Sequence, residues 1–354
     1  MKHLKVGIIG AGGIAAKMHL PELQTVDHCD VVMLSGRKQS RLDVLCRKFK
    51  VPRWTHEYQA VIDDEEVNAV AIALPHPLHV EWGIKAIEAG KHVYMQKPLS
   101  TSMDEADAFV EATDNHNQTV LALPYMSNPH VLASRDYIQE GKLGTISSAQ
   151  ARASHGGPEV YYAGIQQILE EKPADDLWFF DADKADVGAL FDMGVYAIAN
   201  LVGVAGAVKS ITAKLTTVAK PTKLEDTASM ILEFESGALG TAQTGWCDAA
   251  RTYEFSVHGT AGKLVSSRQA ESLRYYYPSS QVDEDAPLVE EIIDLSTYPV
   301  QNSHQHWADC IRKGIQPPLS NAATARHVTE ILLAALKSSR ENRTVDITSR
   351  LNLI

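Results

Sequence analysis

Short apolar runs alternate with amphipathic segments along the first third of the chain. The apolar runs, which are typical of buried strands, lie at 4–9, 30–35, 68–74, 91–95 and 119–123. The amphipathic segments, which are typical of helices, lie between them at 14–24, 40–49, 78–89 and 103–113. Strands that alternate with helices in this way favour a parallel, doubly wound sheet. We therefore expect an α/β domain over residues 1–123.

The pattern changes after residue 124. Strand patterns now follow one another across short turns, at 145–154, 207–218, 228–235, 238–246 and 252–258. Such strands predict an open, mostly antiparallel sheet. Helical patterns lie at 129–141, 186–203, 303–313 and 321–340, and an irregular, aromatic-rich segment is expected at 156–185. The fold class is thus α/β followed by α+β, with residues 124–354 as a second domain for substrate binding and oligomer formation.

Composition narrows the classes of partner. The 354 residues are enough for two domains at roughly 100–200 residues each. A net charge of −11 disfavours nucleic acid and anionic membranes, which both attract basic surfaces. No apolar run approaches the length of a transmembrane helix. The four cysteines form no C-x-x-C pair and the N-terminus has no signal-peptide pattern, so we expect a cytoplasmic protein without a disulfide framework.

A glycine motif follows the first strand directly. Gly10-Ala-Gly12-Gly13-Ile14-Ala15 has the form G-x-G-x-x-A and opens the first helix. Gly10 permits the tight turn, Gly12 lets the backbone approach a pyrophosphate, and the helix N-terminus attracts the phosphates. This position between strand and helix predicts a Rossmann dinucleotide-binding domain in which the motif contacts the cofactor.

The end of the second strand suggests which dinucleotide binds. NAD-binding domains place Asp or Glu there, about 20 residues after the glycines, to bind the ribose 2′-hydroxyl. Here Ser35 is followed by Gly36, Arg37 and Lys38, without an acid. Ser35, Arg37 and Lys38 could bind a 2′-phosphate, so NADP is favoured and NAD is possible. The alternative is that the two cations only begin a solvated loop.

Further motifs extend over most of the chain. They are Pro75-His-Pro-Leu-His79, Ala89-Gly-Lys-His-Val-Tyr-Met-Gln96-Lys97-Pro98, Gly188-Ala-Leu-Phe-Asp192-Met-Gly194-Val-Tyr196 and Thr344-Val-Asp-Ile. The chain resembles the Gfo/Idh/MocA oxidoreductases, which carry P-x-x-x-H, A-G-K-H-V and E-K-P. With Tyr in the D-x-x-x-[H/Y] motif it is most similar to a sugar and dihydrodiol dehydrogenase branch. Where that family has Glu in E-K-P, this chain has Gln96.

The resemblance implies the roles of individual residues. Lys97 would lie near the nicotinamide, and the other residues implied in cofactor binding are Leu74, Pro75, His76, His79 and Gln96. Asp192 and Tyr196 would lie on one helix face at i, i+4 spacing. Transfer of a hydride to or from a C–OH carbon also requires a group that takes or supplies the hydroxyl proton. We expect Tyr196 to move this proton with Lys97 assisting, or the reverse, and Asp192 to orient Lys97 or bind a hydroxyl.

Several other side chains are candidates for binding a sugar or a metal ion. Aromatic and polar residues that could line a sugar pocket include Tyr125, His155 and Trp178, although packing is an alternative for each. The pairs His76/His79 and His304/His306 have the spacing of metal ligands. They lack cysteine or carboxylate partners, so no metal is expected.

The expected function is an NAD(P)-dependent dehydrogenase or reductase that acts on a sugar, polyol or cyclic diol. One alternative is an NAD-dependent glycosidase, in which the hydride is returned and no net redox change occurs. Another is a non-catalytic NADP-binding sensor. An open sheet in the second domain would expose an apolar face, so a homodimer or homotetramer is expected.

Overall fold

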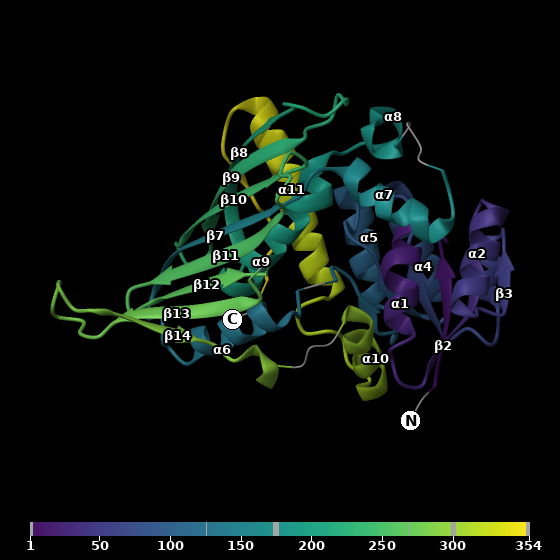
Figure 1. Ribbon diagram of the computed structural model, residues 1–354, viewed down its shortest axis with the longest axis horizontal. Helices are drawn as coiled ribbons and strands as arrows, with labels where there is room; N and C mark the ends of the chain where they lie inside the picture. The colour runs from purple at the N-terminus through teal and green to yellow at the C-terminus, as the bar shows by residue number, and fades with distance from the viewer. Residues whose placement is uncertain (1–2, 125, 173–176, 269, 299–301, 352–354) are drawn as a thin grey trace. The chain divides into compact units, whose positions relative to one another are not determined.

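The computed structural model describes residues 3–124, 126–172, 177–268, 270–298 and 302–351. Contacts divide the chain into two compact units (Figure 1). Unit 1 combines residues 1–125 with 158–178 and 301–329. Unit 2 combines residues 126–157 with 179–300 and 330–354. Each unit is thus assembled from three stretches of sequence, and the division into 1–123 and 124–354 stays a prediction.

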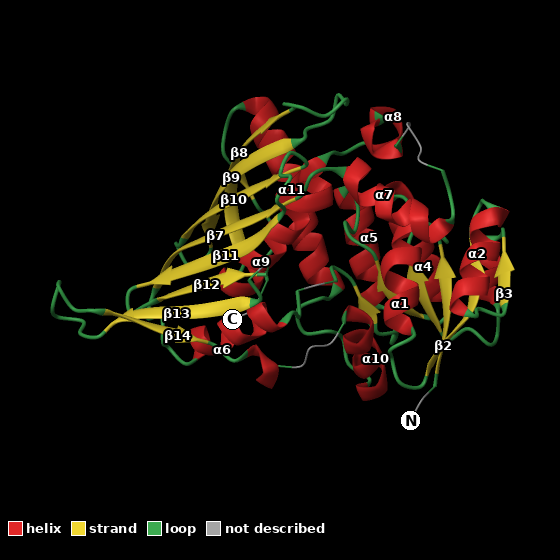
Figure 2. Ribbon diagram, in the orientation of Figure 1, coloured by secondary structure: helices red, strands yellow, loops and turns green. Residues whose placement is uncertain are grey.

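Unit 1 contains a six-stranded, all-parallel sheet with the order β3-β2-β1-β4-β5-β6. Its strands are β1 (Leu4–Ile9), β2 (Cys29–Ser35), β3 (Arg53–Thr55), β4 (Ala69–Ile72), β5 (His92–Met95) and β6 (Val120–Leu121). Its helices include α1 (Leu20–Leu23), α2 (Gln39–Phe49), α3 (Tyr58–Asp63), α4 (His79–Glu88) and α5 (Met103–Asp114) (Figure 2). This order is that of a Rossmann domain, as predicted. The short elements β3 and α3 were not predicted.

Two later helices complete the core of unit 1. They are α7 (Pro158–Leu169) and α10 (Ser303–Lys313). Ile165 of α7 and Trp307 of α10 are buried in the same apolar cluster as Val6 and Leu34. The expectation of an irregular segment at 156–185 is therefore wrong for residues 158–169, which form a regular helix. Its aromatic content obscured a helical period in which Tyr161, Ile165, Ile168 and Leu169 share one face.

Unit 2 contains a nine-stranded sheet in which, among the described strands, only β7 and β10 pair in parallel. Its strands are β7 (Ile146–Ser154), β8 (Val208–Thr216), β9 (Thr227–Phe234), β10 (Leu239–Gly245), β11 (Thr252–Gly259), β12 (Lys263–Ser267), β13 (Ser272–Pro278), β14 (Leu288–Ile292) and β15 (Val345–Asp346). Figure 2 shows them side by side from β8 to β14. The mostly antiparallel sheet is confirmed, and β12 to β15 extend it beyond the predicted strands.

Helix α9 (Val195–Ala205) packs against the centre of this sheet, on β7, β10 and β11, and contacts α6 (Pro129–Gln139). The strands alternate buried and exposed positions because one face meets these helices. The other face carries mostly polar side chains, among which Ile231 and Leu239 are exposed.

The remaining long helix is α11 (Ala322–Glu341), which begins in unit 1 and ends in unit 2. Among the described residues, no helix is both long and apolar enough to cross a membrane. The described residues also hold no group of three or more His, Cys, Asp or Glu side chains arranged to bind a metal ion.

Candidate active site

The glycine turn after β1 is held by its neighbouring strands. The backbone N–H groups of Gly10 and Ala11 donate to the Ser35 carbonyl, at 3.0 and 2.7 Å. Gly10 has φ of +106°, and a Cβ at this position would lie 2.4 Å from the Ala73 carbonyl oxygen. Only glycine fits at this position, and the turn lies between the end of β2 and the end of β4.

The next two glycines differ in their surroundings. A Cβ on Gly12 would meet no atom within 4 Å, so space for a ligand lies directly beside its backbone. Gly13 is instead covered by Ile165 of α7, and Ile14 packs on the core. The helix that starts here includes a π-helical turn, Ala15–His19, before α1. Its N-terminus therefore directs the positive end of its dipole toward the turn, as a pyrophosphate requires.

The three residues predicted to bind a 2′-phosphate lie in different environments. Ser35 is fully buried, and its hydroxyl donates to the Ile8 carbonyl at 3.3 Å. Arg37 is exposed and forms no ion pair with any acid among the described residues. Lys38 is also exposed, with its Nζ 4.0 Å from a carboxylate oxygen of Glu171. The cations at the β2 end are thus accessible, whereas the serine hydroxyl is bound to the strand.

The loop after β4 carries Leu74, Pro75 and the two predicted histidines. His79 Nδ1 lies 2.8 Å from the Pro98 carbonyl and Nε2 lies 2.8 Å from the Leu74 carbonyl. Burial lowers the pKa of His79, while the two carbonyl groups act in the opposite direction. The ring joins the end of β4 to the turn at Lys97, so it is well placed to position that turn.

His76 lies beside aromatic rings of unit 1. The centroid of the His76 ring is 5.6 Å from that of Trp178 and 5.8 Å from that of His79. Trp178 in turn donates from Nε1 to the Tyr162 hydroxyl at 3.3 Å. The predicted residues Trp178 and His76 are thus brought together, although they are about 100 residues apart in the sequence. Tyr125, which was also predicted to bind substrate, lies outside the described residues.

Gln96 begins a chain of buried hydrogen bonds beneath Lys97. Its Oε1 accepts from the Lys97 backbone N–H at 3.1 Å, and its Nε2 lies 3.2 Å from His19 Nε2. His19 Nδ1 then lies 2.8 Å from His304 Nε2, and His304 Nδ1 lies 2.7 Å from a Glu22 carboxylate oxygen. Both imidazole side chains are fully buried.

The donor and acceptor in each of these hydrogen bonds follow from the first bond. Because the Lys97 N–H must donate, Gln96 offers its carbonyl oxygen there and its amide nitrogen to His19. His19 therefore accepts at Nε2 and donates from Nδ1, and His304 repeats the pattern toward Glu22. Burial lowers the pKa of His304 to about 3 and that of His19 well below its usual range. Two neutral histidines thus hold Gln96, and with it the backbone at Lys97.

Asp192 and Tyr196 lie at one edge of the sheet of unit 2. Asp192 belongs to a π-helical turn, Leu190–Gly194, that leads into α9. Its carboxylate accepts from Trp246 Nε1 at 2.9 Å, and His155 Nε2 lies 3.6 Å away. The Tyr196 ring packs edge-to-face on Tyr253, with centroids 6.1 Å apart. The predicted set of His155, Asp192 and Tyr196 is thus assembled within this unit.

The topology explains why these partners meet. His155 and Trp246 directly follow β7 and β10, which are parallel, and Tyr253 is the second residue of β11, which is antiparallel to β7. All three therefore lie at the same sheet edge. Short π-helical turns often occur at functional sites. Neither Trp246 nor Tyr253 carries a local sequence signal that links it to Asp192 or Tyr196.

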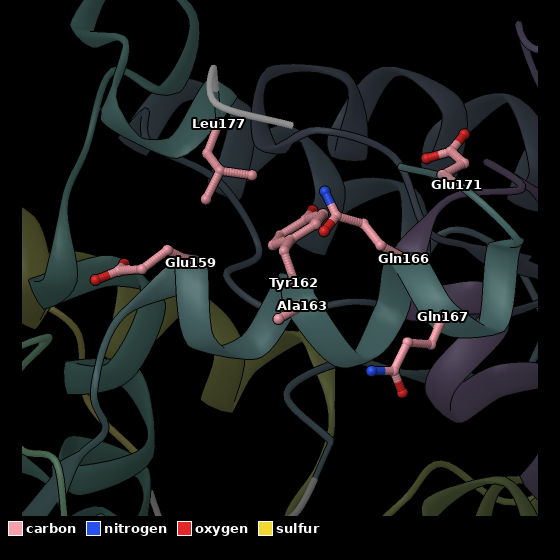
Figure 3. Close-up of a pocket in the computed structure, with 7 residues that line it drawn as sticks. All are labelled: Glu159, Tyr162, Ala163, Gln166, Gln167, Glu171 and Leu177. Carbon is pink, nitrogen blue, oxygen red and sulfur yellow. The ribbon is translucent and has the colours of Figure 1, made fainter. Parts of the chain in front are cut away.

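A cavity of about 280 Å³ lies along α7 in unit 1. Figure 3 shows Tyr162 and Gln166 on the same side of this helix, toward Leu177 and Glu171. Glu171 follows the helix and binds Arg41 in the first turn of α2, with two bonds of 2.6 Å. Arg41 and Glu171 were not predicted as site residues. Arg41 could have been noticed as a third cation after the second strand, but Glu171 is 130 residues away.

Two family models match separate parts of the chain. Residues 4–123 match the oxidoreductase family with an NAD-binding Rossmann fold, Gfo/Idh/MocA. Residues 131–265 match the Gfo/Idh/MocA C-terminal domain. Together the two matches span well over half of the sequence.

Individual relatives align over most of the chain. A levoglucosan dehydrogenase of Pseudarthrobacter phenanthrenivorans is 25% identical, over 80% of this chain and 78% of its own. The NADP⁺-dependent scyllo-inositol 2-dehydrogenase IolW of Bacillus subtilis is 25% identical, over 97% of this chain and 95% of its own. A solved levoglucosan dehydrogenase in complex with NADH has the same fold, with a TM-score of 0.82, 21% identity and coverage of 99% and 100% of the two chains. This chain is therefore a member of the Gfo/Idh/MocA oxidoreductase family.

Proposed function

We propose that this protein is an NAD(P)-dependent dehydrogenase or reductase that acts on a CH–OH carbon of a sugar, polyol or cyclic diol. One observation carries the proposal. The open glycine turn at Gly12 and the turn at Lys97 lie at the carboxyl edge of one parallel sheet, following β1 and β5. Ligands of doubly wound sheets bind at that edge. The residues present therefore fit a dinucleotide, with its pyrophosphate at the glycine turn.

The chain's own residues would handle the proton. A bound nicotinamide supplies the hydride acceptor or donor. In the oxidative direction, Tyr196 takes the proton of the substrate hydroxyl and the ammonium of Lys97 assists by favouring the tyrosinate; the reversed assignment is the alternative. Asp192, held by Trp246, binds a second substrate hydroxyl or orients Lys97. His155 and Trp178 are further candidates for contact with the substrate.

The cofactor is proposed to be NADP in preference to NAD, and the accessible guanidinium of Arg37 supports this preference. We expect Arg37→Ala to weaken NADPH binding by about tenfold or more, because one charge-assisted contact to the 2′-phosphate is lost. NADH binding should change little. Fluorescence titration of the reduced nucleotides measures both dissociation constants. Equal losses for the two nucleotides would remove Arg37 from the 2′-phosphate site.

A panel of sugars, polyols and dihydrodiols, each with NADP⁺ and NAD⁺, tests the function as a whole. We expect at least one class to produce a net rise in reduced-nicotinamide absorbance. Release of a free sugar from a glycoside without such a rise would instead support the glycosidase alternative. Nucleotide binding without turnover of any compound would favour a sensor. The similarity to levoglucosan and scyllo-inositol dehydrogenases makes anhydrosugars and inositols the first compounds to include.

The proposed setting is the cytoplasm, and the proposed assembly is a homodimer or homotetramer. The outer face of the unit 2 sheet is mostly polar, not apolar as expected, and its exposed apolar residues Ile231 and Leu239 mark the candidate surface for contact with a second copy. Light scattering measures the assembly directly, and a monomer at micromolar concentration would contradict it.

A further inference from the structure

The segment that follows α7 reaches the cations near the β2 end. Glu171 accepts from Arg41 Nε and Nη2 through its two oxygens, at 2.6 Å each. Lys38 Nζ lies 4.0 Å from the same carboxylate. This two-bond geometry is the strong form of an arginine–carboxylate pair. The Arg41 and Glu171 side chains are only 25% and 23% exposed to solvent. Solvent therefore screens the attraction between them less than it would for a fully exposed pair.

The position of Glu171 is fixed by the packing of α7. Ile165 covers Gly13 of the glycine turn, and Lys17 Nζ lies 3.8 Å from the Tyr161 ring centroid. Lys48 Nζ donates to the Ile168 carbonyl at 2.6 Å, near the end of α7. The helix is therefore held on the glycine turn through Ile165 and on α2 through its C-terminal end. Glu171 is presented to Arg41 by a packed element of the domain core.

This contact lies where a Rossmann domain holds the adenosine ribose. Near the end of the second strand, an acid binds the ribose 2′-hydroxyl or an arginine accommodates a 2′-phosphate. In this chain that region holds Arg37, Lys38 and Arg41. Glu171 also lines the cavity along α7 (Figure 3), and its carboxylate is bonded to Arg41 and lies near Lys38.

We propose that Glu171 is a determinant of cofactor selectivity, which opposes binding of a 2′-phosphate and favours a free 2′-hydroxyl. A phosphate monoester carries a charge of about −1.5 to −2 at pH 7, so it must share Arg41 with a carboxylate and is repelled by it. A ribose hydroxyl can instead donate to that carboxylate. Glu171 thus supplies, from a segment distant in sequence, the acid that is absent from the end of β2.

The inference rests on the proposed nucleotide site and refines its preference. Arg37 acts in favour of NADP, whereas Glu171 acts against it by occupying Arg41. The selectivity is therefore set by a balance between two groups. Removing the carboxylate should move that balance toward NADP without any change in the glycine turn.

The test compares Glu171→Gln with Glu170→Gln. Glu170 is the matched control, because it is adjacent and also ion-paired, but its partners are Arg47 and Lys48 rather than Arg41. NADPH and NADH are titrated into the wild type and both variants, and the ratio of dissociation constants is measured at low and high salt. We expect E171Q to tighten NADPH binding by about tenfold at low salt, with a smaller gain at high salt. NADH binding should stay the same or weaken, and E170Q should resemble the wild type.

The double variant Glu171→Gln/Arg41→Gln separates this effect from a displacement of α7. If the freed Arg41 binds the 2′-phosphate, the double variant loses the gain in NADPH affinity, whereas a gain that persists overturns the inference. An NADPH/NADH ratio that is the same in wild type, E170Q and E171Q also overturns it and leaves the proposed function standing. Failure of the wild type to bind either nucleotide would overturn both.

Discussion

Replacing Lys97 by Met is expected to lower kcat by about 10²- to 10⁴-fold, the usual range for loss of a group that assists proton transfer. The Lys97 backbone N–H is held by Gln96, and this bond does not depend on the side chain. The turn should therefore keep its shape in the variant. The dissociation constant of the nucleotide should change far less than kcat, because the glycine turn and Arg37 are untouched.

Lys85→Met is the matched control for this prediction. Lys85 lies on α4 of the same unit, is half-buried and pairs with Glu81. Its loss should leave both kcat and nucleotide binding within about twofold, as is usual for surface substitutions. A Lys97→Met enzyme that retained its kcat within a few-fold would contradict the proposed assistance. Comparison with Tyr196→Phe then shows which side chain moves the proton, since loss of that group removes the corresponding limb of the pH–rate profile.

His304→Leu is expected to lower the free energy of unfolding by about 3 kcal/mol at pH 8. The substitution leaves His19 Nδ1 without its acceptor and a partly buried Glu22 oxygen without its donor, and each such loss costs about 1–3 kcal/mol. It also removes a ring stacked on Tyr94, with centroids 4.2 Å apart. Urea denaturation of the two proteins measures the difference.

The same difference should shrink as the pH falls. His304 has a folded-state pKa of about 3, well below its usual value, because it is buried. The unfolded state therefore binds the proton first, so the stability that neutral His304 contributes is fully present above about pH 6.5. It is lost at about 1.4 kcal/mol per pH unit below that value. Leucine does not bind a proton, so it contributes no such pH dependence. The difference in the free energy of unfolding between the wild type and His304→Leu should be clearly smaller at pH 5.5 than at pH 8.

Groups that do not contact His304 are common to both proteins and largely cancel in the comparison. Glu22 is the exception, because it accepts from His304, and loss of this donor disfavours its carboxylate further and widens the difference toward pH 8. Burial raises the pKa of Glu22 to about 7, so the stability that it contributes when protonated is lost as the pH rises through 7. The control is His306→Leu, because His306 lies on the same helix but takes no part in the hydrogen bonds from Gln96 to Glu22. This substitution should lower the free energy of unfolding by about 1 kcal/mol or less. A His304→Leu gap that is independent of pH would show that His304 is not buried in its neutral form.

The sequence by itself determined those features that depend on neighbours within a few residues. The turn at Gly10 was predictable, because a tight turn after a buried strand requires glycine whatever surrounds it. The alternation of strands and helices in residues 1–123 was predictable for the same reason, since periodicity is local. The Gly12, Lys97 and Asp192–Tyr196 motifs could be recognised as candidate site residues, although their roles remain proposals.

The tertiary structure alone decided which distant segments meet. Glu171 reaches Arg41 across 130 residues, and His304 reaches His19 across 285. Neither glutamate nor histidine carries a local pattern that identifies its partner, because such pairs are created by the packing of whole elements. The helix at Pro158–Leu169 was missed since aromatic residues masked its period, and its place in unit 1 follows from burial of Ile165. Local sequence thus specified the elements, and burial of their apolar faces specified the contacts that bear on cofactor choice and on the turn at Lys97.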